Sequence, residues 1–154
     1  MANVQAFCNS AKLNLLKGNI ALGVCDVART IATKDAFKAA LYEAGATIDA
    51  NTTSYTATGE VSGTNYTAGG IDVPNVDNDP ALDTGVAFWT PKTEMVYSNV
   101  TLSTAFNAML IYSNSYALKY ALSVHLFGNQ TVLAGDFVLT MPSNNGTSGL
   151  IRLA

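Results

Sequence analysis

The stretch Tyr120-Ala-Leu-Ser-Val-His-Leu126 alternates large apolar residues with small or polar ones. A period of two is typical of a β-strand with one face on a core, because successive side chains of a strand point to opposite sides. The core face would carry Tyr120, Leu122, Val124 and Leu126, and His125 would lie on the opposite face. This stretch therefore indicates a β fold.

Shorter apolar or alternating segments surround it, and most are stopped by a proline, a glycine or a polar break. They are Phe37–Leu41, Val86–Trp89, Met95–Tyr97, Ala108–Tyr112, Phe137–Met141 and Leu150–Leu153. Residues 49–70, rich in Thr, Ser, Tyr and Gly, fit either turn-linked strands or an ordered loop, and two prolines place residues 74–84 in a surface loop. Seven or eight short strands predict an antiparallel β-sandwich or jelly roll over residues 33–154.

The N-terminal segment has a different period. From Asn3 to Lys17 the apolar residues recur at spacings of three and four, which predicts a helix with Asn3 as its N-cap. Either this helix is sunk into its own domain or it packs against another subunit. Residues 1–32 would form an N-terminal helix and arm, with Ile20 to Ile31 irregular or a short strand. The first contact surface to consider is the helix face with Phe7, Leu13 and Leu16.

Composition limits the function. Only 12% of the residues are charged and 49% are apolar, whereas charged residues make up roughly a quarter of an average domain. The net charge is −3 and the eight Lys and Arg are scattered, which argues against nucleic-acid binding. No stretch resembles a secretory signal or a membrane span, so we expect a protein made in the cytoplasm. Its weakly polar surface predicts cover by neighbouring subunits.

Catalytic and metal-binding motifs are not evident. His125 is the only histidine, no nucleophile or zinc motif accompanies it, and Cys8 and Cys25 lack metal-ligand spacing. We therefore predict no enzyme, no cofactor and no metal, and a structural histidine that faces solvent or an interface.

Four aspartates fall in or beside one proline-containing loop: Asp72, Asp77, Asp79 and Asp83. Carboxylates are calcium ligands, but the glycine and distal glutamate of an EF-hand are missing, which favours solvated turns. The loop is the second predicted contact surface, since it could meet a basic patch on a partner protein.

Seven tyrosines and Trp89 leave two interpretations open. They could form a stacking platform for a sugar or a base, or they could serve packing and subunit contact, for which interfaces favour tyrosine.

Several segments together resemble a recurrent family of tailed-bacteriophage virion proteins. They are Asp35-Ala-Phe-Lys-Ala-Ala-Leu-Tyr42, Thr53-Ser-Tyr55, Glu60-Val-Ser-Gly-Thr-Asn-Tyr-Thr-Ala-Gly-Gly70, Leu110-Ile-Tyr112 and Ala134-Gly-Asp-Phe-Val-Leu139. The resemblance covers residues 33–154, with a looser match in the N-terminal segment. It implies a small structural component of the particle, similar to capsid cement or decoration subunits, without catalytic residues.

The sequence thus predicts a capsid cement subunit of the virion that forms a homo-oligomer and bridges major capsid proteins, without direct contact with nucleic acid or membrane. The alternatives are a tail or head-to-tail connector component, or a carbohydrate-binding module of the virion.

Overall fold

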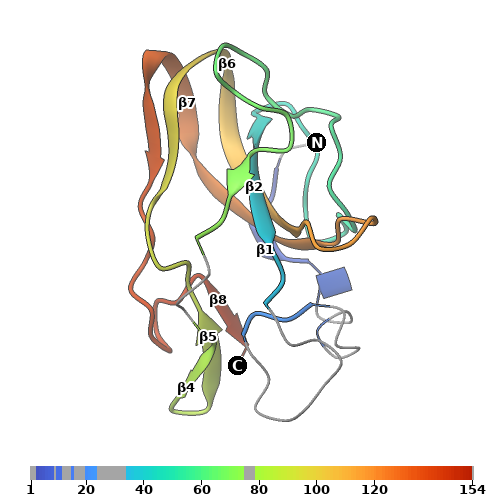
Figure 1. Cartoon of the computed structure of the whole chain (residues 1–154), viewed down its shortest axis with the longest axis vertical. Coiled ribbons are helices and arrows are strands. Elements are labelled where there is room, and N and C mark those ends of the chain that lie inside the picture. The colour runs from blue at the N-terminus through green and yellow to red at the C-terminus, as the bar shows by residue number, and fades with distance from the viewer. Residues whose placement is uncertain are drawn as a thin grey trace.

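A computed structural model describes residues 3–8, 10–11, 15, 20–23, 34–74 and 79–153. Within these ranges eight strands form two antiparallel sheets, so the predicted mainly β class is confirmed (Figure 1). The larger sheet has the order β1-β7-β6-β2-β3 and the smaller sheet the order β4-β5-β8. The bounds are β1 Ala6–Phe7, β2 Phe37–Glu43, β3 Ile71–Asp72, β4 Ala81–Asp83, β5 Val86–Trp89, β6 Met95–Ser113, β7 Ala121–Leu139 and β8 Ile151–Leu153.

Two strands of 19 residues, β6 and β7, form one long hairpin and supply the centre of the larger sheet. The prediction of separate strands at Met95–Tyr97 and Ala108–Tyr112 is wrong, because β6 runs through both. Likewise, β7 runs through the predicted break between Leu126 and Phe137. The pairing shifts register at several points along the hairpin, and these bulges allow the strands to continue through residues that lack a regular alternation.

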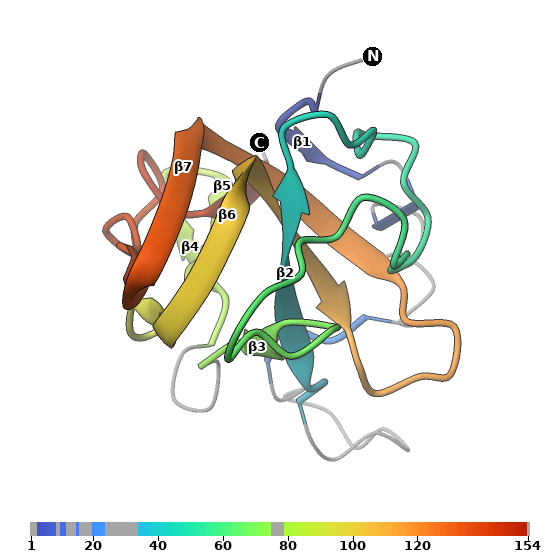
Figure 2. The same cartoon turned by 90° about the horizontal axis from the view of Figure 1, so that it is seen from above.

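The hairpin bends back on itself. Phe127 and Phe137 both belong to β7, and ten residues of straight strand would separate them by about 33 Å. Their ring centroids lie only 5.4 Å apart. Between these two residues Ala134 has a φ of 51°, a strained backbone for a residue other than glycine. Residues 95–105 and 127–139, which we call the outer arm, include this bend, and beyond it the hairpin runs in a different direction, as Figure 2 shows.

The central strand β2 is covered on both faces. Residues 39–42 are all fully buried, although a one-sided strand would expose every second residue. The outer arm covers β2, because the Tyr97 hydroxyl donates a 2.7 Å hydrogen bond to the Ala39 carbonyl. The smaller sheet also contacts it, since the Trp89 ring lies 6.0 Å from that of Phe37.

Residues 44–70 form an ordered loop with isolated bridges, which is one of the two predicted alternatives. The Glu60 carboxylate fastens this loop internally by accepting hydrogen bonds from the hydroxyls of Tyr55 and Tyr66 and from the Gly69 backbone. Tyr66 also accepts a 3.0 Å bond from the backbone N–H of Leu41. This network holds the loop against β2.

The loop predicted at residues 74–84 is exposed where it is described, but it contains the short strand β4. Of the segment Ile20 to Ile31, residues 20–23 are irregular and the rest lies outside the described residues.

The predicted helix from Asn3 to Lys17 is not supported. Ala6 and Phe7 are extended and pair with Val124 and Ser123 of β7, which satisfies their backbone in a sheet rather than in a helix. Asn3 does not act as a cap, because its side chain bonds to the backbone of residues 43 and 48 instead. Among the later described residues, Ser10, Ala11 and Leu15 have a helical backbone, but no helix can be bounded there.

No helix in the described part of the chain is long and apolar enough to cross a membrane.

Candidate functional site

The four aspartates of the predicted acidic surface have different surroundings. Asp72 forms an ion pair of 3.3 Å with Lys38, and Asp79 forms one of 2.8 Å with Lys34. Asp83 is exposed on β4, and Asp77 lies outside the described residues. In the part of the chain that is described, no three His, Cys, Asp or Glu side chains gather as metal ligands would. Two of the four aspartates thus already have a lysine partner.

The predicted hydrophobic contact surface is described only at Phe7. This side chain is partly buried on β1 and packs against the core. Leu13 and Leu16 lie outside the described residues. That these three residues contact another subunit stays a prediction.

The aromatic residues do not form one exposed platform. The side chains of Tyr42, Tyr97, Tyr112 and Trp89 are at most 2% exposed, so they cannot stack on a ligand from solvent. Tyr55 is stacked on Tyr112 inside the molecule, at a centroid distance of 4.8 Å. These aromatic residues therefore serve packing, the second of the two interpretations drawn from the sequence.

A different exposed surface appears on the outer arm. Leu133 is 76% exposed, and the cross-strand partners Val96 and Val138 are 39% and 43% exposed. Leu126 adds a fourth partly exposed apolar side chain at the base of the arm. Sequence reasoning missed this surface because Leu126 and the residues after it were assigned to the core face or to a break between strands.

The same part of β7 has an unpaired side. β6 pairs with one side of β7, whereas on the opposite side β1 pairs only at Ser123 and Val124 and no described strand pairs from Leu126 to Leu139. We call this side the free edge. Proteins usually protect such edges with lysine, proline or a cover. The sequence from 126 to 139 has no proline or lysine, and its one charge, Asp136, accepts a bond from the Asn99 backbone.

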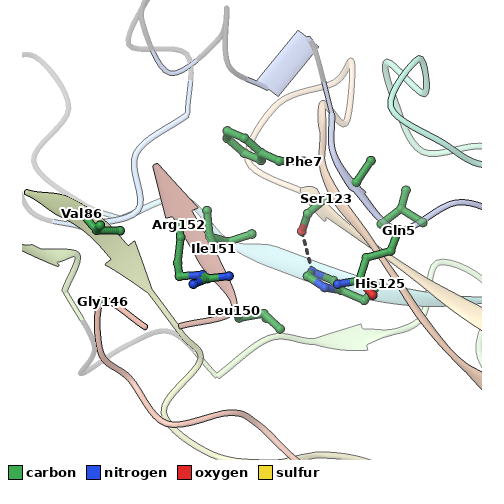
Figure 3. A pocket seen from close by; sticks show the side chains of 11 residues that line it. Gln5, Phe7, Val86, Ser123, His125, Gly146, Leu150, Ile151 and Arg152 are labelled. Atoms are coloured by element: carbon green, nitrogen blue, oxygen red, sulfur yellow. Dashed lines mark hydrogen bonds between the residues drawn. The ribbon is translucent and has the colours of Figure 1, made fainter. Parts of the chain in front are cut away.

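A pocket of about 430 Å³ lies where β1 and β7 face β5 and β8 (Figure 3). On one wall the Ser123 hydroxyl and His125 Nε2 are 2.8 Å apart, and Arg152 extends from β8 on the other. Burial lowers the pKa of His125 to about 4, so the imidazole is neutral near pH 7. The partner of His125 could have been found from the sequence, because residues two apart on a strand share a face.

This pocket has part of the chemistry of a nucleophilic site. A serine and a histidine in contact are two groups of a catalytic triad, and the third is a carboxylate that orients the ring. No carboxylate of the described residues bonds to His125. Cys8 is buried, and burial raises the pKa of its thiol to about 11, so the thiol is protonated near pH 7.

The chain matches no protein-family model, and no curated protein or solved structure resembles it significantly.

Proposed function

We propose that this protein is a structural subunit of a tailed-bacteriophage virion, a capsid cement protein that associates with copies of itself and with major capsid proteins. In this proposal the fold is a β-sandwich or jelly roll, and the outer arm and the rest of the larger sheet are two of its layers. The observation that carries the proposal is the free edge of β7 with its exposed apolar side chains.

The free edge offers a directional contact. An edge strand has backbone N–H and C=O groups that can pair with a strand of another chain, and such pairing fixes both position and orientation. Leu133 and Val138 lie on this strand and are exposed. Burying their apolar surface would add about 25 cal/mol per Å² to the backbone hydrogen bonds.

The low charge of the chain supports the same proposal. With 12% charged residues, approach to another weakly charged surface requires little desolvation of ions. A modest contact energy is sufficient in a shell, because many symmetry-related copies bind together. The resemblance of residues 33–154 to virion proteins supplies the expected partner, a major capsid protein.

The proposal can be tested with Leu133→Lys, which places a charge on the free edge. The matched control is Leu82→Lys, because Leu82 is 73% exposed on β4 and lies outside the outer arm. Heads assembled without the protein would be incubated with each purified variant, sedimented and analysed for bound subunit. We expect Leu133→Lys to reduce occupancy at least about tenfold, which corresponds to about 1.4 kcal/mol, and Leu82→Lys to bind like the wild type.

Cryo-electron microscopy of the intact particle gives the decisive second measurement. Density for this chain over the junctions of capsid subunits, with the free edge against a neighbour, would support the proposal. Density along the tail or at the connector would replace it with the runner-up, a tail or head-to-tail component. Absence of the chain from the particle would overturn it.

A further inference from the structure

The pocket between the two sheets is a candidate ligand site that the proposed capsid contact does not use. Its volume, about 430 Å³, falls in the range of cavities that enclose small organic molecules. The larger sheet contributes Phe7, Ser123 and His125 to the walls, and the smaller sheet contributes Val86 and Arg152. Figure 3 shows Arg152 extending toward the wall that holds Ser123 and His125.

Arg152 is the only charged residue of the lining, and no described carboxylate forms an ion pair with it. One of its terminal nitrogens donates a 2.6 Å hydrogen bond to the Thr147 carbonyl. This bond holds the guanidinium in place, while the group has five N–H donors in all. The Asp83 side chain lies close to Gly146 of the lining, and no ion pair joins it to Arg152.

The opposite wall supplies a neutral polar pair. When the Ser123 hydroxyl donates to Nε2 of His125, the neutral ring carries its proton on Nδ1. That N–H has no partner among the described residues. Ser123 is 1% exposed, so the pair is fixed in the wall rather than free on the surface. In this tautomer the wall with His125 has a neutral N–H donor, and the opposite wall has the charged guanidinium of Arg152.

The remaining lining is mainly apolar, with Phe7, Val86, Leu150 and Ile151. An anion with many charges, such as a phosphate ester, would find one guanidinium and several hydrocarbon side chains, which is a poor match. A single carboxylate matches a planar guanidinium, because both of its oxygens can accept from the fork of N–H groups.

We propose that this cavity binds a carboxylate attached to a small apolar group, with the carboxylate on Arg152 and the apolar group against Phe7 and Ile151. Two sources present this chemistry. One is a free aromatic or branched aliphatic acid, and the other is the C-terminal residue of a peptide with an apolar side chain.

The single histidine makes the test specific, since the imidazole signals in an NMR spectrum can only come from His125. The probes are benzoate and benzamide, which share a shape but differ in charge. We expect benzoate to shift the His125 signals in a saturable manner and benzamide to bind at least about tenfold more weakly. Equal binding of the two probes, or no saturable shift with benzoate or with the peptide acid described next, would overturn the proposal.

The peptide acetyl-Ala-Ala-Leu, as the free acid and as the C-terminal amide, distinguishes the sources. If the free acid binds more tightly than both its amide and benzoate, the ligand is a chain terminus. If benzoate binds more tightly than the peptide acid, the ligand is a free small acid. Either order supports a carboxylate site.

Two variants that each remove one positive charge test whether the ligand's carboxylate binds at Arg152. Arg152→Gln removes the cation from the pocket, and because Arg152 is exposed the variant should fold. Lys119→Gln removes a cation that lies 4.8 Å from the Tyr55 ring, outside the pocket lining. We expect Arg152→Gln to weaken benzoate binding at least about tenfold and Lys119→Gln to leave it unchanged. Undiminished binding by Arg152→Gln would refute the assignment.

Discussion

The hydroxyl of Tyr66 donates a 2.7 Å hydrogen bond to Oε1 of Glu60, and the two residues belong to the loop that covers the central strand β2. The same hydroxyl accepts from the backbone of Leu41 in β2, so the phenol joins the loop to the sheet. The other carboxylate oxygen of Glu60 accepts a 2.6 Å bond from Tyr55. One carboxylate thus anchors two aromatic side chains of a long loop.

Replacing this carboxylate should destabilise the protein. The variant Glu60→Gln loses the negative charge. It also replaces one of the two oxygens that accept from a tyrosine hydroxyl by an NH₂ group, which cannot accept. We expect the free energy of unfolding to fall by about 1–3 kcal/mol, the usual cost of losing charge-assisted bonds in a partly buried site. Urea denaturation measures this change. Glu94→Gln, at an exposed position, is the control and should change stability by less than about 0.5 kcal/mol.

The buried phenols should make the protein sensitive to alkali. Burial, with Glu60 nearby, raises the pKa of Tyr112 to about 12, and burial also raises the pKa of Tyr66 and Tyr97. The folded state therefore keeps protons that the unfolded state releases above about pH 10. Stability is full below that pH and declines as the pH rises toward 12. Tyrosinate absorbance and circular dichroism should change together, whereas ionisation of these buried phenols with the fold intact would contradict the expectation.

Protonation of His125 should destabilise the folded protein at acid pH. Its folded pKa of about 4 lies below the ordinary 6.5, so the unfolded state binds a proton in this interval that the folded state does not. Stability is therefore complete above about pH 6.5 and is lost as the pH falls toward 4, by at most about 3 kcal/mol. Comparison with His125→Gln isolates this contribution. If the two proteins lose stability in parallel, the histidine is not responsible.

Gly70 marks a place where the loop touches β2. Its φ is 75°, and a Cβ on this residue would overlap the carbonyl oxygen of Ala39. We expect Gly70→Ala to cost more than about 3 kcal/mol or to prevent folding, because both the backbone conformation and the contact are lost. Gly128→Ala is the matched control, since a Cβ there meets nothing within 4 Å. Thermal unfolding of the two variants should separate them clearly.

Asn3 fastens the N-terminal segment to the larger sheet. Its side chain is 6% exposed, donates to the Glu43 carbonyl and to Asn107, and accepts from the backbone N–H of Ile48. Asn3→Ala leaves these groups without their partner, and we expect a loss of about 1–3 kcal/mol. The control is Asn129→Ala at an exposed position. Equal stability of the two variants would mean that the segment contributes nothing to the fold before assembly.

The sequence predicts the position of several strands, and β5 was predicted with its observed bounds, Val86–Trp89. The prediction that Tyr120–Leu126 has one covered face is wrong, because residues 121–124 are all buried and Leu126 is 37% exposed. Sequence reasoning also fails at the bend, because residues such as Gly128 and Gly135 look like a break between strands. β7 is continuous there because it pairs with β6 on both sides of the bend, and no local period records this pairing. The N-terminal spacing misled for a similar reason, since pairing with β7 overrides a helical pattern at Ala6 and Phe7.

Only some of the contacts in the candidate sites could be predicted from the sequence. The lysine partners of Asp72 and Asp79 lie 34 and 45 residues away along the chain, and only the fold brings them together. The pairing of Ser123 with His125 could be predicted, because residues two apart on a strand share a face. The position of Arg152 could not, because it lies on β8 of the smaller sheet and only the fold brings it to the same pocket.

The bend in the β6–β7 hairpin has a kinetic consequence. One continuous segment, residues 95–139, supplies Phe106, Phe127 and Phe137, whose rings contact one another. Contacts between residues close in sequence form faster than distant ones, so we expect this hairpin to form early in folding. Strand β2 would then pair with β6 of the bent hairpin, and residues 3–8 would pack against the larger sheet last.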